Sequence, residues 1–346
     1  METPPSPVAQ KSFATFAATE AVDPQPPAHS PDASDRILTR IMKLITWRRN
    51  TQAIPTDLTI PVYDPANPTN KDTVLYLAYG SNLCAATFRG TRGIKPLSAA
   101  NVLVPALELV FDLPGIPYTE PCFANTRFTS SSDMPQELQS AAMEKTALLA
   151  QDKKNVPNTA TALGWQKGLV GVVYEVTKED FAHIIATEGG GSSYKDILVD
   201  CYYLPHDAKV VDPEPTGKPF KAHTLFAKAD TERTRRDGWA QASARYIGLL
   251  RTGSVEHSLP ADYQTWLNSL QPYTMTSRRQ TFGKFFFMLT WFPVMIFVMG
   301  SGRMFADKKG RAPKWHAWLV MKVFLAVWTS YDYGFKAIFG EGERTV

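Results

Sequence analysis

The stretch that decides the fold is Leu75-Tyr76-Leu77-Ala78-Tyr79-Gly80-Ser81-Asn82-Leu83. Its apolar first half predicts a buried strand, which breaks off abruptly at Gly80, Ser81 and Asn82. A strand that ends in such residues presents backbone N–H groups at its tip, where a carboxylate or carbonyl oxygen can bind. We therefore expect a ligand-binding loop here rather than a simple turn.

Composition excludes several classes of protein. The 346 residues, 44% hydrophobic and 20% charged, are enough for one large domain or two ordinary ones with a sizeable core. The net charge of +4 is modest, and no basic stripe with interleaved aromatic residues indicates a nucleic-acid partner. The N-terminus lacks the apolar core and cleavage site of a secretory signal.

The cysteines point to a reducing compartment. Cys84, Cys122 and Cys201 are odd in number and widely spaced, which fits neither a disulfide framework nor a zinc site. The histidines His183 and His223 form no ligand spacing with a cysteine or a second histidine. We expect no metal, and we expect a protein that is cytoplasmic or that faces the cytoplasm from a membrane.

The region 1–72 precedes the expected domain. Seven prolines within residues 1–34 predict a disordered tail. Apolar residues at helical spacing, mixed with arginine and lysine, predict a basic amphipathic helix at 35–49. That helix fits an anionic membrane surface, a targeting segment, or packing on the domain. Residues 55–70 resemble a linker.

The pattern of residues 73–271 predicts an α+β domain, and a small barrel is one form that such a domain takes. A polar segment at 129–160 is interpreted as an insertion. The predicted strands are 73–79, 101–111, 169–176, 197–204 and 222–227, and the predicted helices are 178–186, 243–250 and 261–270, with a loop at 251–260 between the last two.

The region 278–346 is strongly apolar. Phe285–Gly302 carries no charge and is just long enough to cross a bilayer of ~30 Å at ~1.5 Å per residue. The second stretch, Trp315–Phe339, contains three charged residues and suits the membrane interface better. Basic residues flank the first run on both sides, so we expect membrane association through 285–339 from the cytoplasmic side. Packing on the domain, or an oligomer interface, is the alternative.

A second chemical signal is Glu188, which ends a predicted helix directly before Gly189, Gly190 and Gly191. Glycines let a substrate approach the backbone, and a carboxylate partly removed from water gains the proton affinity that a general base needs. A solvated glutamate before a glycine cap has the same sequence pattern.

Three motifs in order resemble the γ-glutamylcyclotransferases. They are Tyr76–Leu83, then Gly171-Val172-Val173-Tyr174-Glu175-Val176 leading to Glu188-Gly189, and finally Ala244-Arg245-Tyr246-Ile247 followed by Leu259-Pro260-Ala261-Asp262-Tyr263. The resemblance covers about 73–271, and the extra apolar region indicates a fungal-type member.

The resemblance implies a small mixed β-barrel with flanking helices, to which the chain adds C-terminal apolar helices. It also implies a small-molecule γ-glutamyl substrate and no metal or organic cofactor. The implied catalytic residue is Glu188. The implied substrate-binding residues are Tyr76, Ala78, Tyr79, Gly80, Ser81, Asn82, Leu83 and Tyr246.

The implied reaction is a ring closure. Glu188 would take a proton from the substrate's α-amine, which then attacks its own γ-carbonyl and releases 5-oxoproline and a free amine. N–H groups of the loop at 79–83 would bind the oxyanion. The long glycine run suggests a wider pocket for a bulkier γ-glutamyl conjugate. The alternatives are a cyclase for glutathione or γ-glutamylamines, and a non-catalytic binding or scaffold protein with the same fold.

Overall fold

A computed structural model describes residues 60–63, 72–130, 164–187, 194–227, 240–304 and 313–346. All of them belong to one unit, residues 49–346. The predicted helix at 35–49, nearly all of the predicted tail and of the insertion at 129–160, and Glu188 lie outside the described residues. Those assignments stay predictions.

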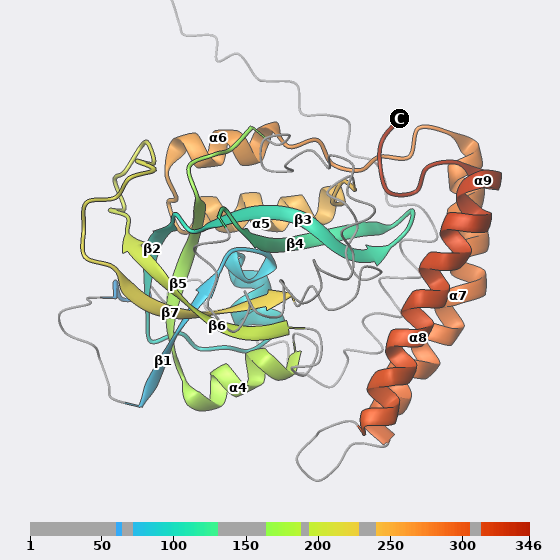
Figure 1. Cartoon of the computed structure of the whole chain (residues 1–346), viewed down its shortest axis with the longest axis horizontal. Coiled ribbons are helices and arrows are strands. Elements are labelled where there is room, and N and C mark those ends of the chain that lie inside the picture. Colours follow the sequence, from blue (N-terminus) through green and yellow to red (C-terminus); the bar gives the residue numbers. More distant parts are fainter. Residues whose placement is uncertain (1–59, 64–71, 131–163, 188–193, 228–239, 305–312) are drawn as a thin grey trace, which may run out of the picture. The chain divides into compact units, whose positions relative to one another are not determined.

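Five strands close into a barrel in the order β1-β5-β2-β6-β7 (Figure 1). Four of the neighbouring pairs are antiparallel, whereas β1 and β7 run parallel, so the barrel is mixed as predicted. The α+β class with flanking helices is therefore confirmed. The strands are β1 (Thr73–Ala78), β2 (Ser98–Val104), β5 (Leu169–Thr177), β6 (Tyr194–Tyr203) and β7 (Phe220–Ala227).

The strand β5 explains why the middle of the barrel is so apolar. Eight of its nine residues, from Leu169 to Val176, are buried, as expected for a strand covered on both faces. A Cβ at Gly171 would lie 2.6 Å from the carbonyl oxygen of Ala78, so only glycine lets β1 and β5 approach this closely. Inside the pattern, Glu175 is fully buried and accepts hydrogen bonds from the hydroxyls of Thr73 and Ser98 at 2.8 and 2.7 Å.

A two-stranded hairpin forms a second sheet that packs against the barrel core. It consists of β3 (Leu107–Ile116) and β4 (Glu120–Phe128), paired from Leu107↔Phe128 to Ile116↔Glu120. The single strand predicted at 101–111 is wrong, because the chain turns between β2 and β3. The sequence also missed β4, whose proline and polar residues hide its strand pattern, and whose Asn125 amide bonds to Asp112 across the hairpin at 2.8 Å.

The linker predicted at 55–70 is also partly wrong. Val62 pairs in parallel with Ala99 of β2, and the N–H of Tyr63 donates to the Ala99 carbonyl at 2.8 Å. The Tyr63 side chain is only 7% exposed. The packed structure therefore includes this short segment before β1.

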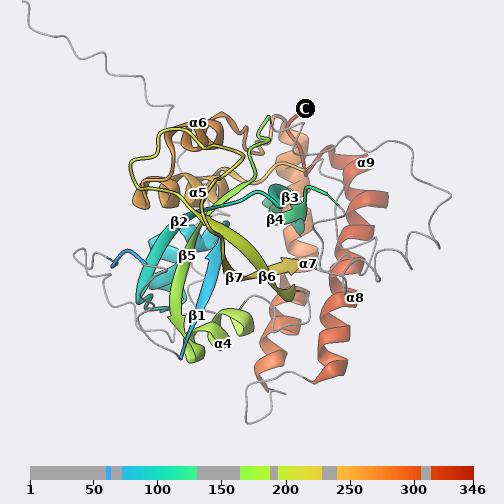
Figure 2. The ribbon, with the colours of Figure 1, turned by 60° about the vertical axis from the view of Figure 1, so that its left-hand side comes forward.

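Helices cover two sides of the barrel. The helix α4 (Lys178–Thr187) lies on one side, and α5 (Ala244–Glu256) with α6 (Ala261–Ser269) lies on another (Figures 1 and 2). The predicted start of α4 is confirmed, since the N–H of Asp180 donates to the Thr177 hydroxyl at 3.1 Å.

The loop predicted at 251–260 is wrong for its first half, because α5 continues to Glu256. Thr252, Gly253 and Ser254 have low helix propensity, which explains the prediction. Gly253 and Ser254 are buried in the structure, so tertiary packing overrides local preference there.

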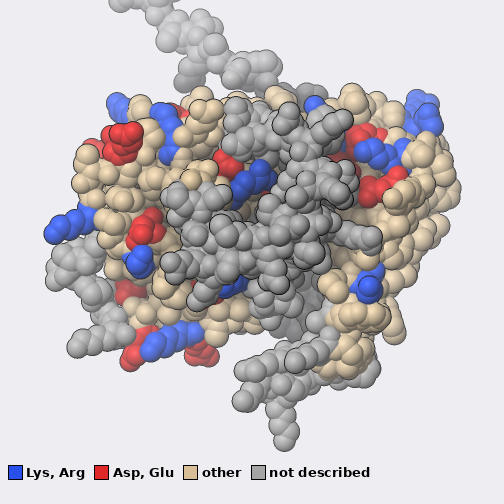
Figure 3. Space-filling model, in the orientation of Figure 1, with Lys and Arg blue, Asp and Glu red and all other residues tan. Residues whose placement is uncertain are grey.

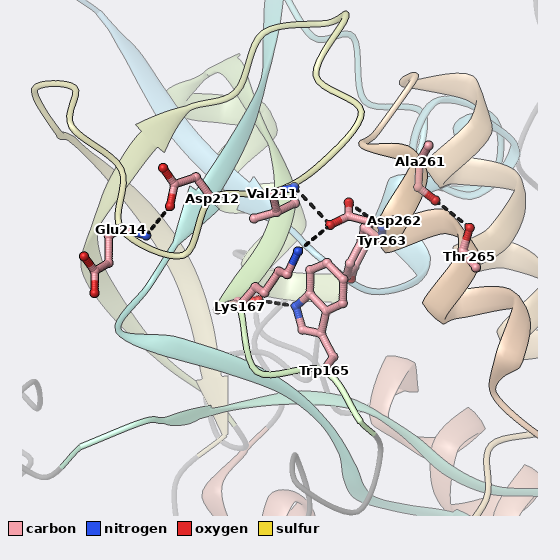
Figure 4. A network of polar contacts seen from close by, with 10 residues as sticks. Trp165, Lys167, Val211, Asp212, Glu214, Ala261, Asp262, Tyr263 and Thr265 are labelled. Carbon is pink, nitrogen blue, oxygen red and sulfur yellow. Dashed lines mark hydrogen bonds and ion pairs between the residues drawn. The ribbon is translucent and has the colours of Figure 1, made fainter.

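The start of α6 is tied to two loops by one carboxylate (Figure 4). Asp262 forms an ion pair with Lys167 at 2.9 Å and accepts from the N–H of Val211 at 3.0 Å. It also accepts from the N–H of Tyr263 at 2.8 Å. The aspartate of the Leu259–Tyr263 motif thus has a structural role.

The C-terminal region forms a helical pair, α7 (Arg278–Met304) and α8 (Lys314–Ser330), which lie side by side in both views (Figures 1 and 2). Two short elements follow, η4 (Tyr331–Phe335) and α9 (Lys336–Phe339). A small core of Tyr118, Phe287, Val327, Trp328 and Tyr331 joins these helices to the tip of the β3–β4 hairpin. Both predicted apolar runs are therefore helical.

Candidate active site

The loop after β1 is a tight 3₁₀ turn, η1 (Ser81–Leu83). The N–H of Leu83 donates to the Gly80 carbonyl at 3.0 Å, and the N–H of Cys84 donates to the Ser81 carbonyl at 3.2 Å. The N–H of Ser81 precedes these bonds and takes no part in them. Because Gly80 and Ser81 are partly exposed, this end of the turn is open to a ligand oxygen.

Tyr246 of α5 lies directly beside this loop. A Cβ placed on Gly80 would be 3.0 Å from the Tyr246 hydroxyl and 3.6 Å from the Ala124 side chain. The hydroxyl accepts from the N–H of Ala124 at 3.2 Å, and its ring meets Phe123 edge-on at 5.1 Å. The fold thus brings together Gly80 and Tyr246, two of the residues predicted to bind substrate, from opposite ends of the domain.

The other predicted binding residues are mostly internal. The Asn82 amide donates to the Tyr76 hydroxyl at 2.9 Å, and the Tyr79 hydroxyl donates to the Leu225 carbonyl at 3.0 Å. Tyr76, Tyr79 and Asn82 are each less than one-tenth exposed, as are Ala78 and Leu83. Their side chains fix the loop's shape, and the loop meets the surface through Gly80 and Ser81.

The last turn of α5 packs against the same loop. A Cβ at Gly253 would lie 2.5 Å from the carbonyl carbon of Leu83, so the helix touches the loop backbone there. Glu256 then accepts from the N–H of Ala85 at 2.7 Å. Because Tyr246 lies in the first turn of α5 and Gly253 in its last part, both ends of the helix contact the loop.

Sequence reasoning missed a pair behind the loop, formed by the buried Tyr174 and the half-buried His257. The hydroxyl of Tyr174 and Nε2 of His257 are 2.7 Å apart, and the Tyr174 hydroxyl also lies 3.5 Å from the Asn82 carbonyl. Burial lowers the pKa of His257 to about 4, opposed by a hydrogen bond of its imidazole to the Leu83 backbone. A neutral imidazole can accept a hydrogen bond from the Tyr174 hydroxyl through Nε2. Tyr174 stands in the second motif, but nothing in the sequence paired it with His257.

Glu188 lies one residue beyond the described end of α4. That helix runs in the direction of β1: Lys178 at its start forms an ion pair with Asp72 at 2.8 Å, and Phe181 then meets Tyr76 at 6.3 Å between ring centroids. At its end, the Thr187 hydroxyl accepts from Arg92 at 2.6 Å. The helix thus passes from the start of β1, past Tyr76, to Arg92, the residue that follows η2 (Ala86–Thr91).

The cysteines are structural in this arrangement. All three are buried free thiols, and burial raises the pKa of Cys201 to about 12 and that of Cys122 well above its usual range. Within the described ranges, no three His, Cys, Asp or Glu side chains come together as a metal site.

Comparisons with known proteins fall into two groups. The AclK C-terminal domain matches residues 277–338, which are the helices α7 and α8 and their continuation. Two solved structures, a γ-glutamyl cyclotransferase and a human protein, each cover 60% of this chain at 19% identity, with TM-scores of 0.39. They cover 92% and 94% of their own chains.

The sequence relatives are named enzymes of filamentous fungi. The γ-glutamyl cyclotransferase aclK of Aspergillus oryzae is 27% identical over 295 residues, which are 83% of this chain and 94% of the relative. The γ-glutamyl cyclotransferase gliK of Aspergillus fumigatus is 31% identical over 274 residues, which are 78% of this chain and 89% of the relative. The chain therefore belongs to the γ-glutamyl cyclotransferase family and is an enzyme of that class.

Proposed function

We propose that the enzyme closes a γ-glutamyl group into 5-oxoproline, with Glu188 as general acid and base. The single observation that carries the proposal is the contact of Tyr246 with Gly80 at the open end of η1. The role of Glu188 is supported by its place in the sequence, directly after Thr187 at the end of α4, a helix whose Phe181 packs against Tyr76 of β1.

The chemistry requires protons to pass from the attacking nitrogen to the departing one. The α-amine must be neutral before it attacks, so Glu188 takes its proton, and the tether between amine and γ-carbonyl favours the five-membered ring. As the carbonyl carbon becomes tetrahedral, its oxygen gains charge and is bound by the backbone N–H of Ser81 at the open end of η1. Glu188 then gives that proton to the departing nitrogen as its C–N bond breaks, and the second proton lost by the ring nitrogen goes to the released amine.

The substrate class we favour is a bulky γ-glutamyl conjugate, such as a glutathione adduct or a secondary-metabolite intermediate. Three consecutive glycines follow Glu188 in the sequence, and glycines add no side chains that would exclude a bulky substrate. Small γ-glutamyl amino acids, glutathione itself and γ-glutamylamines are the competing substrates.

The test uses the purified full chain and measures 5-oxoproline from a glutathione S-conjugate, glutathione, a γ-glutamyl amino acid and γ-glutamyl-lysine. Glu188→Gln should lower turnover by about 10³-fold, within the usual range for a lost proton-transfer group. Glu179→Gln, on the exposed face of the same helix, should keep wild-type turnover.

Two results would count against this proposal. Equal activity of Glu188→Gln and wild type would remove the glutamate from the mechanism. Turnover of small γ-glutamyl amino acids alone would refute the bulky-conjugate substrate while leaving the cyclisation intact.

We also propose that the C-terminal helices attach the enzyme to the cytoplasmic face of a membrane. Among the described residues, Arg278–Val298 is the one helix long and apolar enough to cross a bilayer, and 28% of its most apolar stretch is buried. Phe285, Leu289 and Phe297 are 57%, 61% and 72% exposed. In Figure 3 the surface over α7 and α8 carries few charges.

Basic residues make an anionic surface the favoured partner. Arg278 and Arg279 begin α7, and five lysines and arginines occur between residues 303 and 314, which adds attraction to acidic lipid headgroups. Trp315 and Trp318, 50% and 56% exposed, are residue types that favour the bilayer interface.

Co-sedimentation with vesicles tests this attachment. The full chain should bind vesicles containing phosphatidylserine more tightly than neutral ones, and Phe285→Ser with Leu289→Ser should weaken binding. Val255→Ser, an equally exposed change on α5, should not. If the chain forms a soluble dimer and binds neither kind of vesicle, the apolar face is instead the contact surface for a second copy of the chain.

A further inference from the structure

Residues 340–346, which we call the strap, connect the C-terminal helices to the β3–β4 hairpin. The N–H of Tyr118 at the hairpin tip donates to the Gly342 carbonyl at 2.7 Å, and its hydroxyl donates to the Gly340 carbonyl at 2.8 Å. Tyr118 has φ +62°, a conformation that persists in an L residue only where surrounding contacts impose it. The hairpin tip is thus shaped around the strap.

The strap also holds the segment that leads into α5. The N–H of Gln241 donates to the Glu343 carbonyl at 2.8 Å, and the Gln241 side chain accepts from the N–H of Thr345 at 2.7 Å. Gln241 lies two residues before Ser243, whose hydroxyl caps α5 by accepting from the N–H of Tyr246 at 3.0 Å.

Both attachments therefore lead to the same side chain. From the hairpin, Ala124 and Phe123 contact Tyr246 directly, and Glu120 pairs with Arg245, its neighbour on α5. From the other side, the Gln241 segment sets where the first turn of α5 begins. Tyr246 in turn lies against Gly80 of the substrate loop.

The strap is fixed at its other end by the C-terminal helices. The Tyr331 hydroxyl accepts from the N–H of Gly342 and donates to the Glu341 carboxylate, both at 2.8 Å. Gln280 of α7 donates to the Glu341 carbonyl at 2.8 Å, and Lys336 pairs with the same residue at 2.9 Å. The position of the strap thus depends on how α7, η4 and α9 are arranged.

We propose that the C-terminal helices, acting through the strap, hold Tyr246 against the substrate loop, so that Tyr331, Tyr118 and Gln241 are positioning residues for cyclisation. This inference rests on the proposed function of the Gly80–Tyr246 site. Its physical reason is that a misplacement of about 1 Å at a reacting centre costs on the order of 100-fold in rate. The region matched by the AclK C-terminal domain then belongs to the catalytic architecture as well as to membrane attachment.

The test compares Tyr331→Phe with Tyr246→Phe in the full chain. Tyr331→Phe removes two strap bonds without touching the barrel, and we expect it to lower kcat/KM by about tenfold, less than a full 1 Å displacement would. The change should fall on the same parameter, kcat or KM, that Tyr246→Phe alters. Tyr263→Phe is the matched control, because this buried hydroxyl in α6 has no hydrogen-bond partner among the described residues.

A double-mutant cycle separates positioning from stability. If the strap acts through Tyr246, adding Tyr331→Phe to Tyr246→Phe should cost little more, whereas independent effects multiply. Hydrogen exchange of 120–128 should also increase in Tyr331→Phe. Gln241→Leu, which loses one strap bond at the barrel side, serves the same purpose if Tyr331→Phe melts below the assay temperature.

The outcomes distinguish the two levels of the argument. Inactive wild type, or an unaffected Tyr246→Phe, contradicts the proposed function of the site. An active wild type with a weakened Tyr246→Phe, but with strap variants as active as Tyr263→Phe or effects that simply multiply, overturns the positioning role alone.

Discussion

The barrel and the C-terminal helical pair handle apolar residues in opposite ways. In the barrel, Leu77 of β1 and Val173 of β5 are completely buried within one continuous core. In the helical pair, Phe282 and Phe297 of α7 remain 60% and 72% exposed, and only five residues form the buried cluster that holds the helices to the hairpin tip. The barrel satisfies its own hydrophobic surface, whereas the helical pair presents more than its own contacts cover.

This difference assigns separate physical roles to the two regions. The barrel supplies a rigid frame on which a loop can be held to a fraction of an ångström, as the Gly80–Tyr246 contact requires. The helical pair exposes apolar side chains, which are the surface that the proposed membrane attachment would use. The strap joins the two regions, so we expect a structural change in one region to alter residue positions in the other.

The largest expected effect compares a leucine in each region. Leu77→Ala should lower the free energy of unfolding by about 2–5 kcal/mol, since it leaves a cavity in a closed core. Leu289→Ala, at a position 61% exposed, should change it by less than about 0.5 kcal/mol. Urea unfolding of the two variants checks this. Equal losses would mean that the exposed face of α7 is covered in the folded protein.

Acid should lower the free energy of unfolding by protonating His257, which lies beside the barrel. Its pKa is lowered to about 4 in the folded state, against about 6.5 when unfolded. The unfolded chain therefore binds the proton first, and stability is lost as the pH falls from about 6.5 toward 4, by roughly 3 kcal/mol in total.

Urea unfolding of wild type and His257→Gln between pH 7 and pH 4 measures this contribution. The variant should be less stable at pH 7 but should lack this part of the acid dependence. Parallel pH curves for the two proteins would show that His257 does not titrate in this way.

Two glycines of α5 test how closely the helix is packed on the loop. Gly253→Ala should destabilise by about 1–3 kcal/mol, because its Cβ would meet the Leu83 backbone at 2.5 Å. Gly248→Ala is the matched control in the same helix, with nothing within 4 Å of its Cβ, and should stabilise by about 0.5–1 kcal/mol.

Thermal unfolding and kcat/KM should be measured together for both variants. Gly253→Ala should lose activity as well as stability, because the displaced backbone is that of the substrate loop. Similar behaviour of the two alanines would show that α5 and the loop are not in direct contact.

The smallest effect on stability is expected at Gly80. Its φ of −108° is accessible to alanine, so Gly80→Ala should change stability by less than about 1 kcal/mol. The added Cβ, 3.0 Å from the Tyr246 hydroxyl, should nevertheless lower kcat/KM by about tenfold. Removing that oxygen with Tyr246→Phe should relieve the contact, so the double variant should be better than the product of the two losses. A simple product would separate Gly80 from Tyr246.

Much of the fold was accessible from local pattern. The apolar run of β1, the capping threonine of α4 and the long uncharged run of α7 each carry their signal within a few residues. β4 and the last turn of α5 were not accessible, because strand pairing stabilises the first and close contact with Leu83 the second. These tertiary contacts outweigh the low strand propensity of Pro121 and the low helix propensity of Gly253.

The candidate site divides in the same way. The loop Gly80–Leu83 and Glu188 were predicted as site residues from residue type and order, and Tyr246 from a family resemblance. His257 and Tyr118 gave no signal, because each acts through a partner far away in the chain: Tyr174 for one and Gly342 for the other.

The sequence by itself determined four of the five barrel strands, the loop after β1 and the apolar character of the C-terminal helices, because hydrophobic periodicity and glycine placement are local properties. Only the tertiary structure decided that Tyr246 faces Gly80, that His257 is held neutral behind the loop, and that the strap connects the helices to the site. Contacts of a few ångströms between distant segments depend on how the whole barrel closes, and no window of sequence contains that information.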